Sequence, residues 1–141
     1  MRKRSAYKHE PFESKTEQGK FTKVCDDMMR SPAWNNLLLR QQGLYLHIKS
    51  KYTQKRSSGY IISDNVKDIS LPKKEAATLY GDMRTFRLDM NKLMENGFIV
   101  LIQSGWNTRT ANIYGFSDGW KRIQSSKSTN RNNSPNKKIA V

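Results

Sequence analysis

Apolar residues recur with a helical period in the middle of the chain. Spacings of three and four residues predict an amphipathic helix over 83–96, with Asp82 as its N-cap and Gly97 as its end. Residues 72–80 predict a shorter helix, which begins at a proline and ends at Gly81. The apolar stripe of the longer helix, which we expect in the core, consists of Phe86, Met90 and Leu93. A tight turn therefore separates the two helices.

Two apolar runs follow the longer helix, at 98–102 and 111–116, and a polar stretch joins them. Short apolar runs bounded by turn residues are typical of strands, so this segment predicts a β-hairpin with its tip at 104–110. Helix, tight turn, helix, strand, tip and strand is the order of a winged helix-turn-helix, whose second helix enters the major groove of DNA. We therefore expect an α+β fold with a three-helix body, a small antiparallel sheet and a basic β-hairpin wing.

Further helical segments are expected in the first half of the chain. The apolar stripe over 21–29 has helical spacing, and Ser31 followed by Pro32 signals the cap and first turn of a second segment. A longer helix is predicted over 39–52, where Gly43 costs about 1 kcal/mol relative to alanine. The remaining expectations are a basic loop over 54–59, an edge strand over 60–62, and core positions for Trp34 and Trp120.

Charge is the strongest compositional feature of the chain. Its 141 residues hold 26 Lys and Arg against 12 Asp and Glu, a formal net charge of +14. Such an excess favours a polyanionic partner, because each cation placed on a phosphate releases condensed counterions. The sequence has neither an apolar run of membrane-spanning length nor an amphipathic membrane helix, so no membrane partner is expected. The single cysteine, Cys25, fits a reducing cytoplasm.

Charge and composition divide the chain into three parts. Residues 1–20 carry six basic and three acidic side chains, and we interpret them as a basic mobile arm. Residues 124–141 carry four basic side chains and no acidic one in a Ser- and Asn-rich stretch, which we interpret as a disordered basic tail. The DNA-binding domain is expected over 21–123, which holds 16 basic and nine acidic residues.

The polar face of the helix over 83–96 is the first candidate DNA contact. Its members are Arg84, Thr85, Arg87, Leu88 and Asn91. Arginine can bind guanine bidentately, asparagine can bind adenine, and threonine offers a methyl or a hydroxyl group. A solvated helix face is the alternative for the charged members, and we prefer DNA binding because this helix is the second of a helix-turn-helix. We interpret Asp82 as a cap that occupies the first N–H groups, which a phosphate would otherwise use.

The tip of the hairpin is the second candidate contact. Its candidate residues are Trp106, Asn107, Thr108, Arg109 and Thr110. An arginine here suits a minor groove or a phosphate, and the hydroxyl groups can donate to phosphate oxygens. Trp106 either folds back on the body, which we favour, or packs on a sugar. Lys73 and Lys74, at the start of the shorter helix, are candidate phosphate contacts.

The sequence offers little that points to catalysis or to a metal. His9, His47 and Cys25 are far apart and have no zinc-binding spacing, and the acidic residues lack the clustering of a two-metal nuclease. Neither a phosphate-binding loop nor a dinucleotide motif occurs. We therefore expect a non-enzymatic protein with no catalytic residue, metal or cofactor. A further basic cluster, for which solvation is an equally good explanation, comprises Lys49, Lys51, Lys55 and Arg56.

Several short motifs follow one another along the chain: 21–24 with 28–29, 31–37, 44–45, 84–86 with Leu93, 97–99 and 113–120. In this order they resemble the winged-helix domain at the N-terminus of replication initiators from Gram-positive plasmids and integrative elements, and its short single-domain relatives. The resemblance covers 21–123 and implies sequence-specific binding of double-stranded DNA for a mobile element, in replication, transfer or transcription control. A homodimer on DNA and a replication or transfer protein are candidate further partners. Without the second domain of an initiator, we expect an accessory or regulatory protein.

Two other functions stay open on the sequence. A basic RNA- or ribosome-associated protein would carry the same charge, although only Trp106 and Tyr114 offer it a stacking surface. A winged-helix protein-interaction module would use the charge for solubility. In that case Arg84, Thr85 and Arg87 would be replaceable without loss of nucleic-acid affinity.

Overall fold

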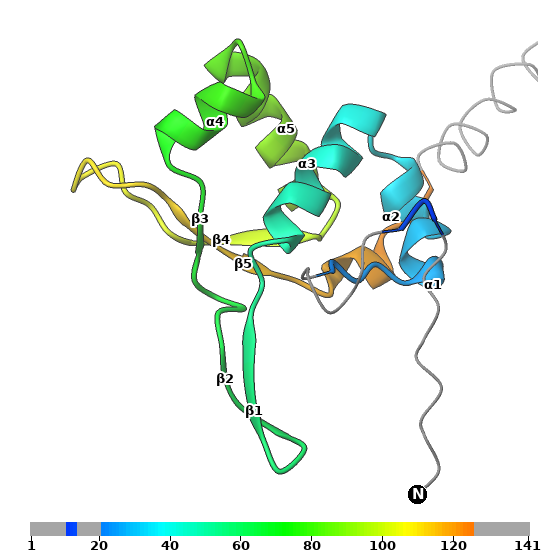
Figure 1. The fold of residues 1–141 in the computed structure, drawn as a ribbon. Helices are drawn as coiled ribbons and strands as arrows, with labels where there is room; N and C mark the ends of the chain where they lie inside the picture. The colour runs from blue at the N-terminus through cyan, green and yellow to red at the C-terminus, as the bar shows by residue number, and fades with distance from the viewer. Residues whose placement is uncertain (1–10, 14–20, 126–141) are drawn as a thin grey trace, which may run out of the picture.

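The computed structural model describes residues 11–13 and 21–125, so the predicted arm lies almost wholly outside the described residues, as does the predicted tail. The helices and strands are α1 (Asp26–Met29), α2 (Pro32–Asn35), α3 (Leu39–Lys49), β1 (Gln54–Ser57), β2 (Tyr60–Asp64), β3 (Ile69–Ser70), α4 (Lys73–Leu79), α5 (Met83–Glu95), β4 (Ile99–Gln103), β5 (Ile113–Phe116) and a final 3-10 turn, η1 (Gly119–Arg122) (Figure 1). These elements form an α+β fold with small antiparallel sheets, as predicted at the level of α+β class.

The strands form two separate sheets. β1 and β2 make a two-stranded hairpin, and the other three strands make a sheet in the order β3-β5-β4. β3 is antiparallel to β5, with Ile69 opposite Tyr114, and β4 is antiparallel to β5, with Ile99 opposite Phe116. β3 was not predicted from the sequence, because a strand of two residues leaves no periodic signal. The sheet therefore connects the segment before α4 to the hairpin after α5.

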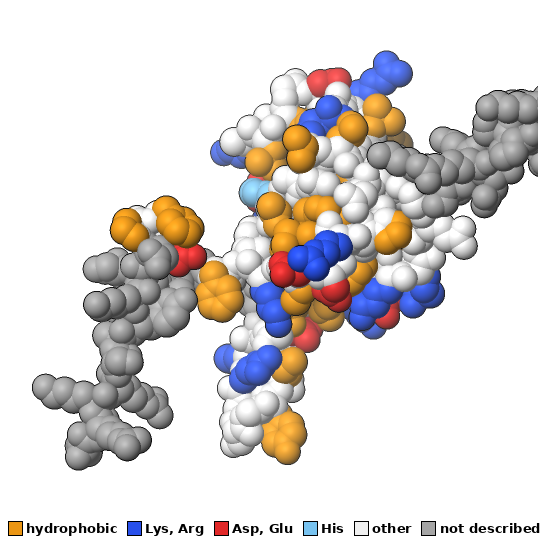
Figure 2. Space-filling model, turned by 90° about the vertical axis from the view of Figure 1, so that its right-hand side faces the viewer, with side chains coloured by type: hydrophobic (Ala, Val, Ile, Leu, Met, Phe, Trp, Pro, Cys, Tyr) orange, Lys and Arg blue, Asp and Glu red, His pale blue; other side chains and the backbone are white. Residues whose placement is uncertain are grey.

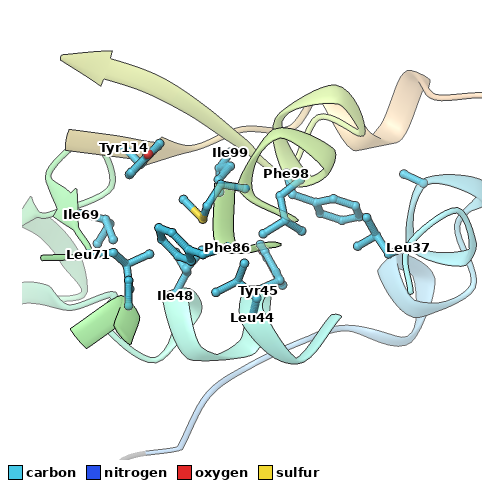
Figure 3. Packing of buried hydrophobic residues seen from close by; sticks show 14 of the residues in the cluster. Leu37, Leu44, Tyr45, Ile48, Ile69, Leu71, Phe86, Phe98, Ile99 and Tyr114 are labelled. Atoms are coloured by element: carbon cyan, nitrogen blue, oxygen red, sulfur yellow. The ribbon is translucent and has the colours of Figure 1, made fainter. Parts of the chain in front are cut away.

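The core lies between α3, α5 and the three-stranded sheet (Figure 3). Its largest fully buried apolar side chains are Phe98, Ile48, Leu93 and Ile99, each at most 1% exposed. The predicted stripe of α5 is buried as expected, at Phe86, Met90 and Leu93. Trp34 is buried and contacts Phe98 edge-on, with ring centroids 5.8 Å apart. Trp120 is half-buried and stacks on the same Phe98 ring at 6.3 Å, so both tryptophans belong to the core or its edge.

The end of α5 depends on a glycine. Gly97 has a φ of 76°, a left-handed conformation that other residues rarely adopt. A Cβ at this position would lie 2.4 Å from the carbonyl carbon of Gly119 and from the backbone nitrogen of Trp120. The Gly97 carbonyl also accepts a hydrogen bond from the Trp120 N–H at 2.9 Å. This close approach attaches the segment after β5 to the end of α5.

Two of the helices predicted in the first half are shorter than expected. The prediction of a helix over 21–29 is wrong for residues 21–25, which are not helical, and Phe21 is 72% exposed. The helix begins at Asp26, where two carboxylates in the first turn favour its positive end. α3 ends at Lys49, three residues before the predicted end, because the N–H groups of Lys51 and Tyr52 donate to carbonyls three residues earlier and form turns instead of helix.

The prediction of a loop over 54–59 is also wrong for residues 54–57, because Gln54–Ser57 forms strand β1. It pairs with β2 across a two-residue turn at Ser58 and Gly59, whose φ values are 53° and 82°. Two positive φ values are typical of a type I′ turn, which matches the twist of a hairpin. Every residue of both strands is exposed, and the hairpin extends from the body (Figure 1). The β1–β2 hairpin therefore depends on its turn geometry and strand pairing, not on burial. The predicted edge strand at 60–62 is confirmed within β2.

Candidate nucleic-acid interface

The outer face of α5 presents most of the residues predicted to contact DNA. The side chains of Arg84, Arg87, Leu88 and Asn91 are exposed, and Leu88 is 59% exposed. In the part of the chain that the structure describes, no ion pair involves Arg84 or Arg87. Arg84 and Arg87 are therefore not held by a carboxylate within ion-pair distance, although the charge of Arg87 is close enough to Asp82 to contribute to the lowered pKa of that carboxyl group.

Thr85 differs from its neighbours because its hydroxyl group is already used. It donates to Asp82 at 3.0 Å, and the other oxygen of that carboxylate accepts the backbone N–H of Arg84 at 2.9 Å. These bonds, the backbone bond from Arg84 first, hold the pKa of Asp82 below its usual value. Asp82 is thus the predicted cap, and its negative charge occupies the start of α5. Thr85, half-buried, has a methyl group rather than a hydroxyl proton to offer a base.

A buried carboxylate fixes α5 against the rest of the body. Asp89 is fully buried and accepts four hydrogen bonds, two from Arg40 at 2.6 and 2.9 Å, one from Gln41 at 3.0 Å and one from the Tyr80 hydroxyl at 2.5 Å. Burial alone would raise the pKa of Asp89, but the bonds from Arg40, Tyr80 and Gln41 outweigh it and hold the pKa below its usual value. The ionised carboxylate on α5 is therefore hydrogen-bonded both to α3 and to Tyr80, the residue that follows α4.

The network was not among the sequence predictions, although the sequence does signal that Asp89 itself is buried. Asp89 lies three residues after Phe86 and four before Leu93, so helical spacing places it on the buried stripe. A bidentate arginine–carboxylate contact is specific in geometry as well as in energy. The network therefore fixes the rotation of α5 about its axis, which keeps the face with Arg84 and Arg87 outward.

The loop that was predicted to be a wing, residues 104–112 between β4 and β5, is closed by hydrogen bonds at its base; we keep the name wing for these residues. The Thr110 N–H donates to the Gly105 carbonyl at 3.1 Å, and the Gly105 N–H donates to the side chain of Asn112 at 2.8 Å. A Cβ on Gly105 would lie 1.9 Å from the Thr110 carbonyl oxygen, so this position requires glycine. The wing is thus a specific loop whose closure determines where its side chains point.

The side chains at the wing tip are directed outward. Trp106 is 87% exposed, so the prediction that it folds back on the body is wrong. The closed loop turns residue 106 away from the sheet, and no aromatic contact in the described chain involves it. Arg109 and Asn107 are exposed, and Arg109 has a left-handed φ of 53°. The hydroxyl groups of Thr108 and Thr110 lie 2.7 Å apart and share a hydrogen bond.

The start of α4 faces the wing. Lys73, Trp106 and Arg109 line one groove with a volume of about 730 Å³. Lys74 is exposed but does not line this groove. The structure therefore brings one of the two predicted phosphate contacts next to the wing and leaves the other on the outer surface of α4.

The remaining polar residues do not assemble a second chemistry. His47 is half-buried, and its Nε2 lies 2.9 Å from Glu75. Glu75 also accepts from Lys51 at 2.8 Å, and although burial acts to raise its pKa, these two partners lower it. Within 11–13 and 21–125, no group of three or more His, Cys, Asp or Glu side chains is placed to hold a metal ion.

Comparisons with known proteins identified no relative of this chain. No protein family, no curated protein and no solved structure was found to match the chain. None of the described helices is both long enough and apolar enough to cross a membrane. The resemblance to plasmid replication initiators therefore stays a prediction made from the residues themselves.

Proposed function

We propose that this protein binds double-stranded DNA in a sequence-specific manner, with α5 in the major groove and the wing on the adjacent groove or backbone. The order β3, α4, α5, β4, β5 supports this proposal, together with the sheet order β3-β5-β4. Two helices joined by a tight turn and followed by a hairpin of the same sheet have the arrangement of a winged helix.

The observation that carries the proposal is the exposed face of α5. Arg84 and Arg87 make no ion pair among the described residues, and Asn91 lies exposed on the same helix. Arginine and asparagine are the side chains that read guanine and adenine bidentately. Because Asp89 holds the helix in one orientation, these groups are positioned before a ligand arrives, which lowers the entropic cost of binding.

We further propose that the protein serves a mobile element as an accessory or regulatory factor in replication, transfer or transcription. An RNA- or ribosome-associated role has less support, because Tyr114 is buried and only Trp106 of the two expected stacking residues is exposed. A protein-interaction role is the remaining alternative, and it predicts that Arg84, Thr85 and Arg87 can be replaced without loss of nucleic-acid affinity.

The test is selection from a library of random duplex DNA at physiological ionic strength, about 150 mM salt, with single-stranded RNA as competitor. Enrichment of one or two half-sites is the expected result, since α5 would read a few base pairs directly. Absence of any enriched motif, with RNA competing equally, would overturn the proposal. The genomic position of an enriched site would then distinguish promoter, replication origin and transfer origin.

A further inference from the structure

A second basic surface lies away from α5, where residues 21–23 pass the end of α3 and the base of the β1–β2 hairpin. A groove of about 550 Å³ lies there. Its charged and aromatic lining side chains are Phe21, Lys23, Lys49, Tyr52, Arg56 and Phe116. In Figure 1 the hairpin extends from the bottom of the body, whereas α4 and α5 lie at the top. We call this hollow the hairpin groove.

The hairpin groove holds positive charge that nothing acidic neutralises. No Asp or Glu lines it, and none of Lys23, Lys49 and Arg56 forms an ion pair in the described part of the chain. Burial, and then the charge of Lys23, lowers the pKa of Lys49, as expected for an ammonium group without an anionic partner. The Arg56 Nε donates to Gln54 at 2.7 Å, which orients the guanidinium group on the strand.

Aromatic rings lie among these cations. The Lys49 ammonium group lies 4.5 Å from the centre of the Tyr52 ring and 5.2 Å from that of Phe116. Phe21, at the outer edge, is 72% exposed and buries little of its surface against the protein itself. In Figure 2 the hairpin, at the bottom, likewise shows basic and hydrophobic side chains next to one another. A groove that combines cations without a carboxylate partner with an exposed ring suits a ligand that has both phosphates and flat bases.

We infer that the hairpin groove binds single-stranded nucleic acid, with phosphates against Lys23, Lys49 and Arg56 and an unpaired base on Phe21. A recessed groove admits a flexible strand whose bases are free to stack, whereas the bases of a duplex are already stacked on one another. An acidic peptide would satisfy the cations but would have no use for the exposed ring. This binding is additional to the duplex binding proposed for α5, and the two surfaces have no residue in common.

The charge test measures fluorescence anisotropy of a labelled oligothymidine of about 12 nucleotides, which covers one site of this kind. Lys23→Gln combined with Arg56→Gln removes two exposed cations of the groove, and Arg30→Gln combined with Lys121→Gln removes two exposed cations outside it. We expect the groove variant to bind about tenfold more weakly, with a salt slope reduced by about 1.4, because each phosphate contact contributes about 0.7. Equal losses in both variants, or no binding by the unaltered protein, would overturn the inference.

The stacking test uses Phe21→Ala with Phe12→Ala as its matched control, since Phe12 is 85% exposed and lies outside the groove. Loss of a stacked base predicts at least about fivefold weaker oligothymidine binding for Phe21→Ala only. If Phe21→Ala binds normally and polyglutamate displaces the oligonucleotide at equal charge concentration, the groove takes acidic peptides and the inference is wrong.

A third arm separates this inference from the proposed function. Arg84→Ala combined with Arg87→Ala is expected to abolish selective duplex binding and to leave oligothymidine binding within about twofold of the unaltered protein. If selection enriches no duplex sequence while the groove variants still lose oligothymidine binding, the proposed function alone would be overturned. If oligothymidine binding depends on Arg84 and Arg87 but not on Lys23 and Arg56, the inference about the hairpin groove alone would be overturned.

Discussion

The guanidinium group of Arg40 donates two hydrogen bonds to the carboxylate of Asp89, at 2.6 and 2.9 Å. The side chain of Arg40 is 51% exposed, whereas that of Asp89 is fully buried. This contact therefore reaches from the surface of α3 to the inner face of α5. If α5 reads DNA, the contact sets the angle at which its outer face meets the groove.

Replacement of Asp89 by alanine should destabilise the fold by about 2–4 kcal/mol, because it leaves the Tyr80 hydroxyl and the Gln41 amide without their acceptor in a buried site. Urea unfolding followed by circular dichroism measures the loss. The matched control is Asp118→Ala, which breaks the exposed Arg122–Asp118 pair and should cost less than about 1 kcal/mol. Similar losses for the two variants would show that the buried network adds no stability of its own.

The same carboxylate predicts how stability depends on pH. The pKa of Asp89 is lower in the folded protein than in the unfolded chain, so its contribution is complete above the unfolded pKa of about 4. It is lost as the pH falls through the folded pKa. The stability difference between the unaltered protein and Asp89→Asn, measured by urea unfolding, should therefore be constant from pH 7 to about 5 and shrink below about pH 4. A difference that grows on acidification would contradict the assignment.

The elements around α5 were predictable because several local signals agree there. Asp82 caps the helix, the stripe with Phe86 and Leu93 has helical spacing, and Gly97 ends it. Asp89 also falls on this stripe by its spacing. Its role as a buried, ionised acceptor depends on Arg40, which lies 49 residues earlier in the chain. A partner at that separation leaves no trace in a local pattern, so the network was not predictable.

Other features were missed because local patterns favoured the wrong structure. The stripe over 21–29 has helical spacing, yet Phe21 has no core to pack against and residues 21–25 are not helical. β1 is polar and wholly exposed, so it lacked the apolar alternation by which strands are recognised. Trp106 was expected to fold back on the body, but it lies 87% exposed in a loop closed by its own hydrogen bonds.

Replacement of two glycines by alanine should change the stability of the fold in opposite directions. Gly97→Ala places a Cβ 2.4 Å from backbone atoms at a positive φ, so we expect a loss of stability of about 2 kcal/mol or more. Gly43→Ala lies within helix α3 with no atom within 4 Å of the added Cβ, so we expect a gain of about 0.5–1 kcal/mol. Thermal unfolding of both variants measures the two shifts. A stabilised Gly97→Ala would contradict the close approach to Gly119.

On the proposed DNA, Arg84 and Lys74 should have different roles. Arg84→Ala removes a candidate base contact, so we expect a loss of about 1–3 kcal/mol on the selected site and a relaxed base preference. Lys74→Ala removes a candidate phosphate contact and should weaken selected and random duplexes equally. Titration of both variants against both duplexes gives the comparison. Equal losses on the two duplexes for Arg84→Ala would remove its role in base recognition.

The wing supplies the last prediction, which separates binding from stability. Trp106 is 87% exposed and makes no ring contact within the described chain, so Trp106→Ala should change the free energy of unfolding by less than about 0.5 kcal/mol. Because Trp106 lines the same groove as Lys73 and Arg109, its loss should weaken duplex binding while the preferred sequence stays the same. Gly105→Ala is the structural comparison, since its Cβ would strike the Thr110 carbonyl and displace the whole tip. Gly105→Ala should therefore weaken duplex binding at least as much as Trp106→Ala. Normal duplex binding by both variants would show that the wing does not contact DNA.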